Sequence, residues 1–139
     1  MKRNYIFLLI TLLFISCARE EDKKLEVYNT EAFAFQVDGG WEVNASARVK
    51  GFQQNTDGKT YSGKLSYSVG IITPANDTIK NIAADELSES QAEEISDLPL
   101  EAQLELDSTY EAGKYQLIFN VKDELSGVSA AAQKEVDLQ

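Results

Sequence analysis

The sequence predicts an all-β domain built as a two-sheet antiparallel sandwich of about seven strands. Three observations support this fold class. Apolar residues recur with a period of two from Val27 onward, no helical stripe competes with that period for long, and turn residues interrupt it at intervals typical of a sandwich. Because the roughly 110 residues after this point can supply one core, we expect a single folded domain.

The first predicted hairpin lies on either side of Gly39. Phe33, Phe35 and Val37 alternate with smaller or polar residues and so share one face, and the sequence Asp38, Gly39, Gly40 is a strong turn signal because glycine accepts positive φ. In residues 41–49 the odd-numbered side chains are apolar and the even-numbered ones polar. This alternation predicts a strand with Trp41 facing the core.

The next elements follow the same logic. A polar loop at residues 55–59 precedes an alternating strand at 65–71, which Pro74 ends because proline cannot donate to a ladder. Residues 77–83 form a weaker strand. The acidic, serine-rich residues 85–97 are predicted to be a long crossover with one loose helical turn or none.

The last part of the domain returns to clean alternation. Residues 100–106 and 115–121 predict two strands separated by a turn at Gly113, and a final strand ends near Val136 and Leu138. Tyr67 and Tyr115 fall on the apolar faces of their strands, as Trp41 does. We therefore expect these three aromatic side chains to pack in the core.

A short motif adds a family resemblance to this pattern. Glu111, Gly113 and Tyr115 resemble the acid, glycine and tyrosine pattern that opens strand F in immunoglobulin-like and fibronectin-like domains, and residues 121–127 resemble the hairpin that follows it. The resemblance implies an immunoglobulin-like sandwich with a tyrosine corner at Tyr115. No cysteine follows two residues after Tyr115, which excludes the antibody-type disulfide.

The N-terminus carries the features of an export signal. Lys2 and Arg3 precede an apolar run at residues 5–15, which is too short to cross about 30 Å of hydrocarbon, since that takes about 20 residues. Phe14, Ile15, Ser16 and Cys17 resemble the bacterial lipobox. The resemblance implies cleavage between Ser16 and Cys17 and a covalent lipid on Cys17, with no other cofactor expected. Two or more acyl chains would give stable membrane attachment.

The expected organisation is a signal peptide at 1–16, a lipidated cysteine with a flexible charged tether at 17–27, and the sandwich at 28–139. Within the tether, Glu20, Glu21 and Asp22 resemble the acidic signal that sends lipoproteins of Bacteroidota to the cell surface. The resemblance implies an outer-membrane protein on the cell-surface face. The periplasmic face is the alternative.

Composition excludes several function classes. The chain has no histidine and a single cysteine, so Ser/His/Asp triads, Cys/His dyads and the usual zinc sites cannot be built. The formal charge of −10 disfavours phosphate backbones, and loss of Lys2 and Arg3 with the signal peptide would make it more negative. We expect neither nucleic-acid binding nor catalysis, and we expect no metal site, although residues 85–97 leave calcium open.

Few residues remain as candidates for contacts with other molecules. Tyr28, Tyr61 and Tyr110 lie near predicted strand ends or loops and could contact a glycan. Thr78 and Ser108 each follow an aspartate, in triplets that look like the O-glycosylation motif of Bacteroidota. The expected function is a non-catalytic module that binds a protein partner in an outer-membrane assembly. A surface glycan-binding module is the alternative.

Overall fold

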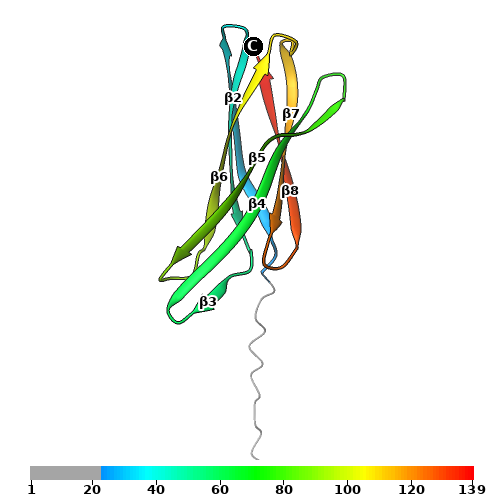
Figure 1. Ribbon diagram of the computed structural model, residues 1–139. Coiled ribbons are helices and arrows are strands. Elements are labelled where there is room, and N and C mark those ends of the chain that lie inside the picture. The colour runs from blue at the N-terminus through cyan, green and yellow to red at the C-terminus, as the bar shows by residue number, and fades with distance from the viewer. Residues whose placement is uncertain (1–22) are drawn as a thin grey trace, which may run out of the picture.

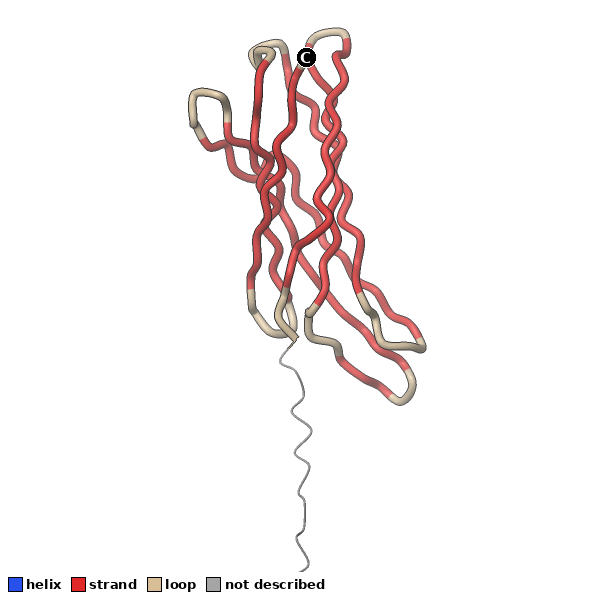
Figure 2. Tube along the Cα trace, turned by 180° about the vertical axis from the view of Figure 1, so that it is seen from behind, coloured by secondary structure: helices blue, strands red, loops and turns tan. Residues whose placement is uncertain are grey.

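The computed structural model describes residues 23–139, and every regular element in this range is a β-strand (Figures 1 and 2). The eight strands are β1 (Glu26–Val37), β2 (Gly40–Lys50), β3 (Asn55–Asp57), β4 (Thr60–Ile72), β5 (Thr78–Gln91), β6 (Asp97–Asp107), β7 (Gly113–Asp123) and β8 (Ser129–Leu138). Residue 23 lies at one end of this elongated body, the proximal end. The C-terminus lies at the opposite, distal end (Figure 1).

The strands form two antiparallel sheets. Sheet A has the order β1-β2-β6. In sheet B, β4 pairs with β7 on one side and β5 on the other, β7 pairs with β8, and the short β3 pairs with the beginning of β4. The predicted fold class, an all-β two-sheet antiparallel sandwich, is confirmed.

One face of each sheet supplies the core, because side chains alternate between the two faces of a strand. The predicted inward positions of β2 are all buried, and Trp41 is 7% exposed. Tyr67 and Tyr115 are also buried, as predicted. The Trp41 Nε1 donates to the carbonyl of Tyr110 at 2.9 Å, and the Tyr67 hydroxyl donates to the carbonyl of Glu101 at 2.7 Å. These bonds satisfy the polar ends of two buried aromatic side chains.

The tyrosine corner implied by the family resemblance is present. Tyr115 lies near the start of β7, and its hydroxyl donates to the backbone carbonyl of Glu111 at 2.9 Å. This bond links the connection before β7 to the beginning of that strand. The same local feature marks the beginning of strand F in immunoglobulin-like sandwiches.

The prediction for residues 85–97 is wrong. Strand β5 continues to Gln91, and only residues 92–96 connect sheet B to sheet A. The 13-residue β4 provides a hydrogen-bonding edge along its whole length, so that Leu87 pairs with Leu65 and Glu86 bonds to Lys64 at 3.1 Å. The acidic side chains of β5 face solvent on an edge strand, where charge discourages pairing with other chains.

Two smaller differences concern strand limits. The predicted loop at 55–59 contains the three-residue β3, which raises the strand number from about seven to eight. Strand β1 begins at Glu26, and Leu25 and Val27 are already buried. The folded domain therefore begins inside the range 17–27 assigned to the tether, because apolar side chains at its end complete the core.

Candidate functional site

The outer face of sheet A carries an exposed apolar stripe, formed by Phe33, Phe35 and Val37 at the distal part of β1. Their exposed fractions are 60%, 55% and 44%. Sequence alternation correctly grouped these three residues on one face, but an apolar face is usually the core face. Here it points to solvent. Contiguous exposed apolar side chains of this kind typically mark interaction surfaces.

A β-bulge turns the stripe outward. The pairing of β1 with β2 shifts in register between Tyr28 and Glu31, and Asn29 within the bulge has a φ of 48°. Before the bulge Val27 points into the core; after it, Ala32 and Ala34 do. One extra residue changes which side of the strand faces the core, since the side-chain period is two.

The small inward side chains suit the position of β1 in the fold. β1 lies at the edge of sheet A, next to β8 at the edge of sheet B. Both strands turn alanines toward the core at this seam, namely Ala32, Ala34, Ala130 and Ala132. Small side chains allow the two edges to approach each other closely. The bulge therefore places alanines inside and leaves the phenylalanines outside.

Carboxylates lie beside the apolar stripe, on β2 and β6 along one side of it and at Glu31 on its proximal end. The register across β1, β2 and β6 gives four successive rows on the outer face: Glu31, Ser46, Glu101; Phe33, Asn44, Gln103; Phe35, Glu42, Glu105; Val37, Gly40, Asp107. We call the five acidic residues of these rows the acidic rim. Within residues 23–139 none of the five forms a salt bridge. A shallow hollow of about 410 Å³ lies beside Phe33 between Asn44 and Gln103.

Basic residues on this face lie only in the two proximal rows. Arg48 forms a salt bridge with Asp97, which also accepts a hydrogen bond from the Tyr28 hydroxyl at 2.7 Å. Lys50 bonds to Glu26 at 3.1 Å and lies 4.8 Å from the centre of the Tyr28 ring. The Arg48 contact and then the Tyr28 contact lower the pKa of Asp97, so this cluster stays ionised and internally paired.

The three tyrosines predicted to contact a glycan do not form one site. Tyr28 is engaged in the cluster just described, and Tyr110 lies near the distal end with its ring 6.2 Å from that of Tyr115. Tyr61 packs partly against the core and lines a cavity of about 790 Å³ at the proximal end, beside Phe52. All three rings are partly buried, and the structure separates them.

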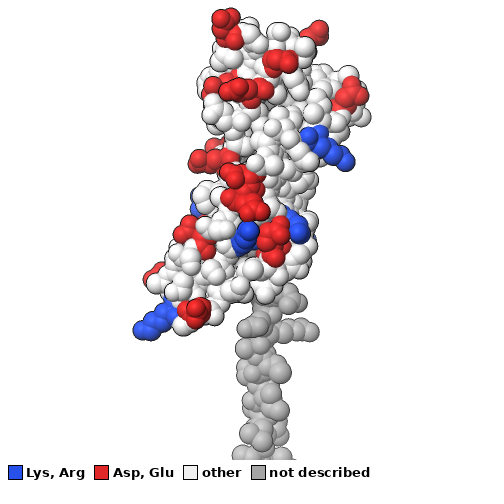
Figure 3. All heavy atoms as spheres, in the orientation of Figure 1, with Lys and Arg blue, Asp and Glu red and all other residues white. Residues whose placement is uncertain are grey.

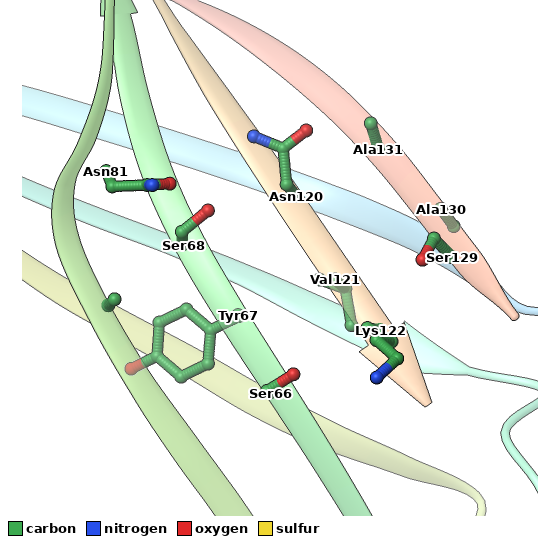
Figure 4. A pocket seen from close by; sticks show the side chains of 11 residues that line it. Ser66, Tyr67, Ser68, Asn81, Asn120, Val121, Lys122, Ser129, Ala130 and Ala131 are labelled. Atoms are coloured by element: carbon green, nitrogen blue, oxygen red, sulfur yellow. The ribbon is translucent and has the colours of Figure 1, made fainter. Parts of the chain in front are cut away.

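A second surface feature is a hollow of about 630 Å³ on the outer face of sheet B, lined by apolar surface together with several serine and asparagine side chains. Figure 4 shows Ser66 and Ser68 on β4, Asn120 on β7, and Asn81 beside them on β5. Lys122 also lines the hollow, and its Nζ bonds to Glu124 at 3.2 Å. Hydroxyl and amide groups can exchange hydrogen bonds with a polar, uncharged ligand.

Thr78 and Ser108, the predicted modification sites, are both exposed. Thr78 is the first residue of β5 and Ser108 follows β6, which places both at the distal end (Figure 1). Asp107 beside Ser108 accepts two hydrogen bonds from Thr109, through its hydroxyl and its backbone N–H, and these lower the pKa of the Asp107 carboxyl. On the face of the molecule seen in Figure 3, the distal tip carries acidic but no basic side chains.

Asp123 is a buried carboxylate that sequence reasoning missed. It is 1% exposed and lies at the end of β7. One oxygen accepts from the Gln53 N–H at 2.7 Å and the Ser126 hydroxyl at 2.8 Å, and the other accepts from the Leu125 N–H at 2.9 Å. Burial alone would raise the pKa of Asp123, but these donors together lower it. The sequence signal for this arrangement is an aspartate three residues before a serine, a spacing typical of side-chain hydrogen bonds in turns.

Several predicted site residues lie outside the described residues: Ser16 and Cys17 at the expected cleavage and lipidation site, and Glu20, Glu21 and Asp22 of the expected export signal. Within residues 23–139, no group of three or more potential ligands is arranged to hold a metal ion. The same range contains no helix long and apolar enough to span a membrane.

Comparison with known proteins adds no family assignment. No protein-family model matches the chain, and no curated protein matches it.

Proposed function

We propose that this chain is a lipid-anchored protein of the bacterial cell envelope, whose sandwich is a non-catalytic module that binds a protein partner through the apolar stripe. The observation that carries this proposal is the exposure of Phe33, Phe35 and Val37 on consecutive outward positions of β1. The lipobox resemblance at Cys17 supports the anchor. The resemblance of residues 20–22 to a surface export signal favours the cell-surface face of the outer membrane over its periplasmic face.

The orientation of the domain agrees with such a role. The anchor would enter at the proximal end, whereas the apolar stripe lies on the distal part of β1, next to the turn at Gly39 (Figure 1). An interaction surface placed there would be held away from the bilayer. A partner in an outer-membrane assembly could then reach it without displacing lipid.

The docking proposal can be tested by site-specific photocrosslinking in the native host. A photoreactive phenylalanine analogue at Phe35 should give one reproducible crosslinked species, identified by mass spectrometry. The same analogue at Ile79, an exposed apolar residue on sheet B, should not give that species. Equal products from both positions, or none from Phe35, would contradict the proposal.

The anchor requires a separate test. Mass spectrometry of the mature N-terminal peptide should show acyl groups on Cys17, and the Cys17→Ser variant should leave the membrane fraction. An unmodified Cys17 thiol in the native protein would refute lipid attachment.

A surface glycan-binding module is the second candidate function, and the serine and asparagine side chains in the hollow of sheet B favour it. Binding at this hollow predicts that Asn120→Leu abolishes signals on a glycan array, while Tyr61→Ala, at the opposite side of sheet B, leaves them unchanged. A glycan array without signal for the unaltered protein would eliminate this candidate.

We also propose O-glycosylation at Thr78 and Ser108, because both are exposed at the distal end, where a modifying enzyme can reach them. Mass spectrometry of the native protein should find a glycan on one or both residues. Unmodified peptides covering both positions would refute the assignment.

A further inference from the structure

The charge around the apolar stripe indicates what kind of surface can cover it. We propose that the partner is a protein surface with an apolar centre flanked by lysine or arginine side chains, and that it is not a second copy of this chain. This inference rests on the proposed function, because it defines the partner of the same docking face. It is carried by the arrangement of the apolar stripe and the acidic rim.

The acidic rim begins one strand away from the apolar stripe, on β2, and continues on β6. Phe35 shares a row with Glu42 and Glu105, and adjacent strands are about 4.8 Å apart, so the whole row spans about 10 Å. Glu31 and Glu101 occupy the row on the proximal side of Phe33. A partner broad enough to bury both phenylalanine rings therefore also covers carboxylates.

Within residues 23–139, no lysine or arginine forms a salt bridge with these carboxylates. Arg48 and Lys50, the basic residues of this face, are paired with Asp97 and Glu26 in the proximal rows. An ionised carboxylate that is covered without a nearby cation loses its hydration and gains no compensating interaction. Complementary charge at the rim of an interface avoids this penalty and also accelerates encounter. The partner must therefore supply the cations.

A second copy of this chain cannot do so. A two-fold dimer through this face would bring the same patch together with itself, and so would place rim carboxylates against rim carboxylates. Like charges placed opposite each other oppose association. Residues 20–22 of the same chain are acidic and have the same defect. Anionic lipid headgroups are disfavoured for the same reason.

The test uses two synthetic peptides as model partners, a ten-residue peptide of alternating valine and lysine and its valine–glutamate counterpart. Each is titrated onto the mature lipidated protein in nanodiscs of zwitterionic lipid, with binding followed by fluorescence anisotropy. We expect the valine–lysine peptide to bind with an affinity that falls as salt rises, and the valine–glutamate peptide not to bind. Sedimentation of the mature chain released from nanodiscs should show a monomer.

Matched variants separate the apolar stripe from general acidity. Phe33→Ser with Phe35→Ser should weaken binding of the valine–lysine peptide at least tenfold, and so should Glu42→Gln with Glu105→Gln. Glu89→Gln with Glu93→Gln removes the same charge from exposed positions elsewhere and should change the affinity less than twofold.

The outcomes distinguish this inference from the proposed function. Failure of the valine–lysine peptide to bind, equal binding of the valine–glutamate peptide, or equal effects of the two glutamine pairs would overturn the basic-partner inference. A dimer that Phe35→Ser abolishes would overturn the exclusion of a second copy. In each case a specific crosslink at Phe35 in cells would still support the docking face. The absence of that crosslink would contradict the proposed function itself.

Discussion

Removing the buried carboxylate of Asp123 should destabilise the domain more than any exposed acid. Its two oxygens accept backbone hydrogen bonds from Gln53 and Leu125, and Ser126 adds its hydroxyl. Gln53 lies in the connection after β2, whereas Asp123 ends β7, so this side chain joins two loops 70 residues apart at the proximal end. The perturbations are Asp123→Ala and Asp123→Asn.

The magnitude follows from the donors left unpaired. Asp123→Ala leaves the partly buried backbone N–H groups of Gln53 and Leu125 without an acceptor, at about 1–3 kcal/mol for each donor at most, so we expect a loss of about 3 kcal/mol. Asparagine can accept at only one of its two terminal atoms, which leaves one donor facing an amide nitrogen and costs about 2 kcal/mol. Either loss is large against a typical domain stability of about 5–15 kcal/mol.

Urea unfolding followed by the fluorescence of Trp41, the single and buried tryptophan, measures these losses. Asp137→Ala, at an exposed position in β8, is the matched control and should change stability by less than about 0.5 kcal/mol. Unfolding midpoints of Asp123→Ala and Asp137→Ala that are both indistinguishable from that of the unaltered protein would refute the structural role of Asp123.

The pH dependence has a definite sign. The pKa of Asp123 is lower in the folded protein than its ordinary value, so the folded state favours the ionised carboxylate. This contribution is fully present above about pH 5 and is lost as the pH falls through the folded-state pKa. The stability difference between the unaltered protein and Asp123→Ala should therefore narrow below about pH 4. A difference that widens on acidification would contradict the assignment.

Three further predictions concern the corner, the first turn and the apolar stripe. Tyr115→Phe removes the hydrogen bond to Glu111 and should cost about 1 kcal/mol in urea unfolding; an unchanged midpoint would show that the corner adds no stability. Gly40→Ala would place a Cβ 2.0 Å from the carbonyl oxygen of Leu106, so that β2 must shift, and we expect about 3 kcal/mol of destabilisation. A normal melting temperature for this variant would be inconsistent with so close a strand approach. Phe35→Ser should change stability by less than about 0.5 kcal/mol because the ring is exposed, and should raise solubility in salt titrations. A loss above 2 kcal/mol would mean that the ring packs into a core.

Sequence pattern was sufficient for the features that depend on neighbouring residues. The alternation at residues 41–49 predicted a strand with Trp41 inside, and the structure confirms both. The Tyr115 corner was also accessible, because donor and acceptor are only four residues apart. Residues 85–91 were mispredicted because their acidic composition disfavours a strand. The long edge of β4 that stabilises β5 cannot be recognised from the residues of β5 themselves.

Taken alone, the chain determined that Phe33, Phe35 and Val37 share one face, since successive side chains of a strand point in opposite directions. Only the tertiary structure decided that this face points outward, because the bulge at Asn29 shifts the phase of the strand where β1 packs beside β8. It also decided that five carboxylates lie beside the apolar stripe. Their proximity comes from pairing between strands that are distant in sequence, and local periodicity carries no information on such pairing.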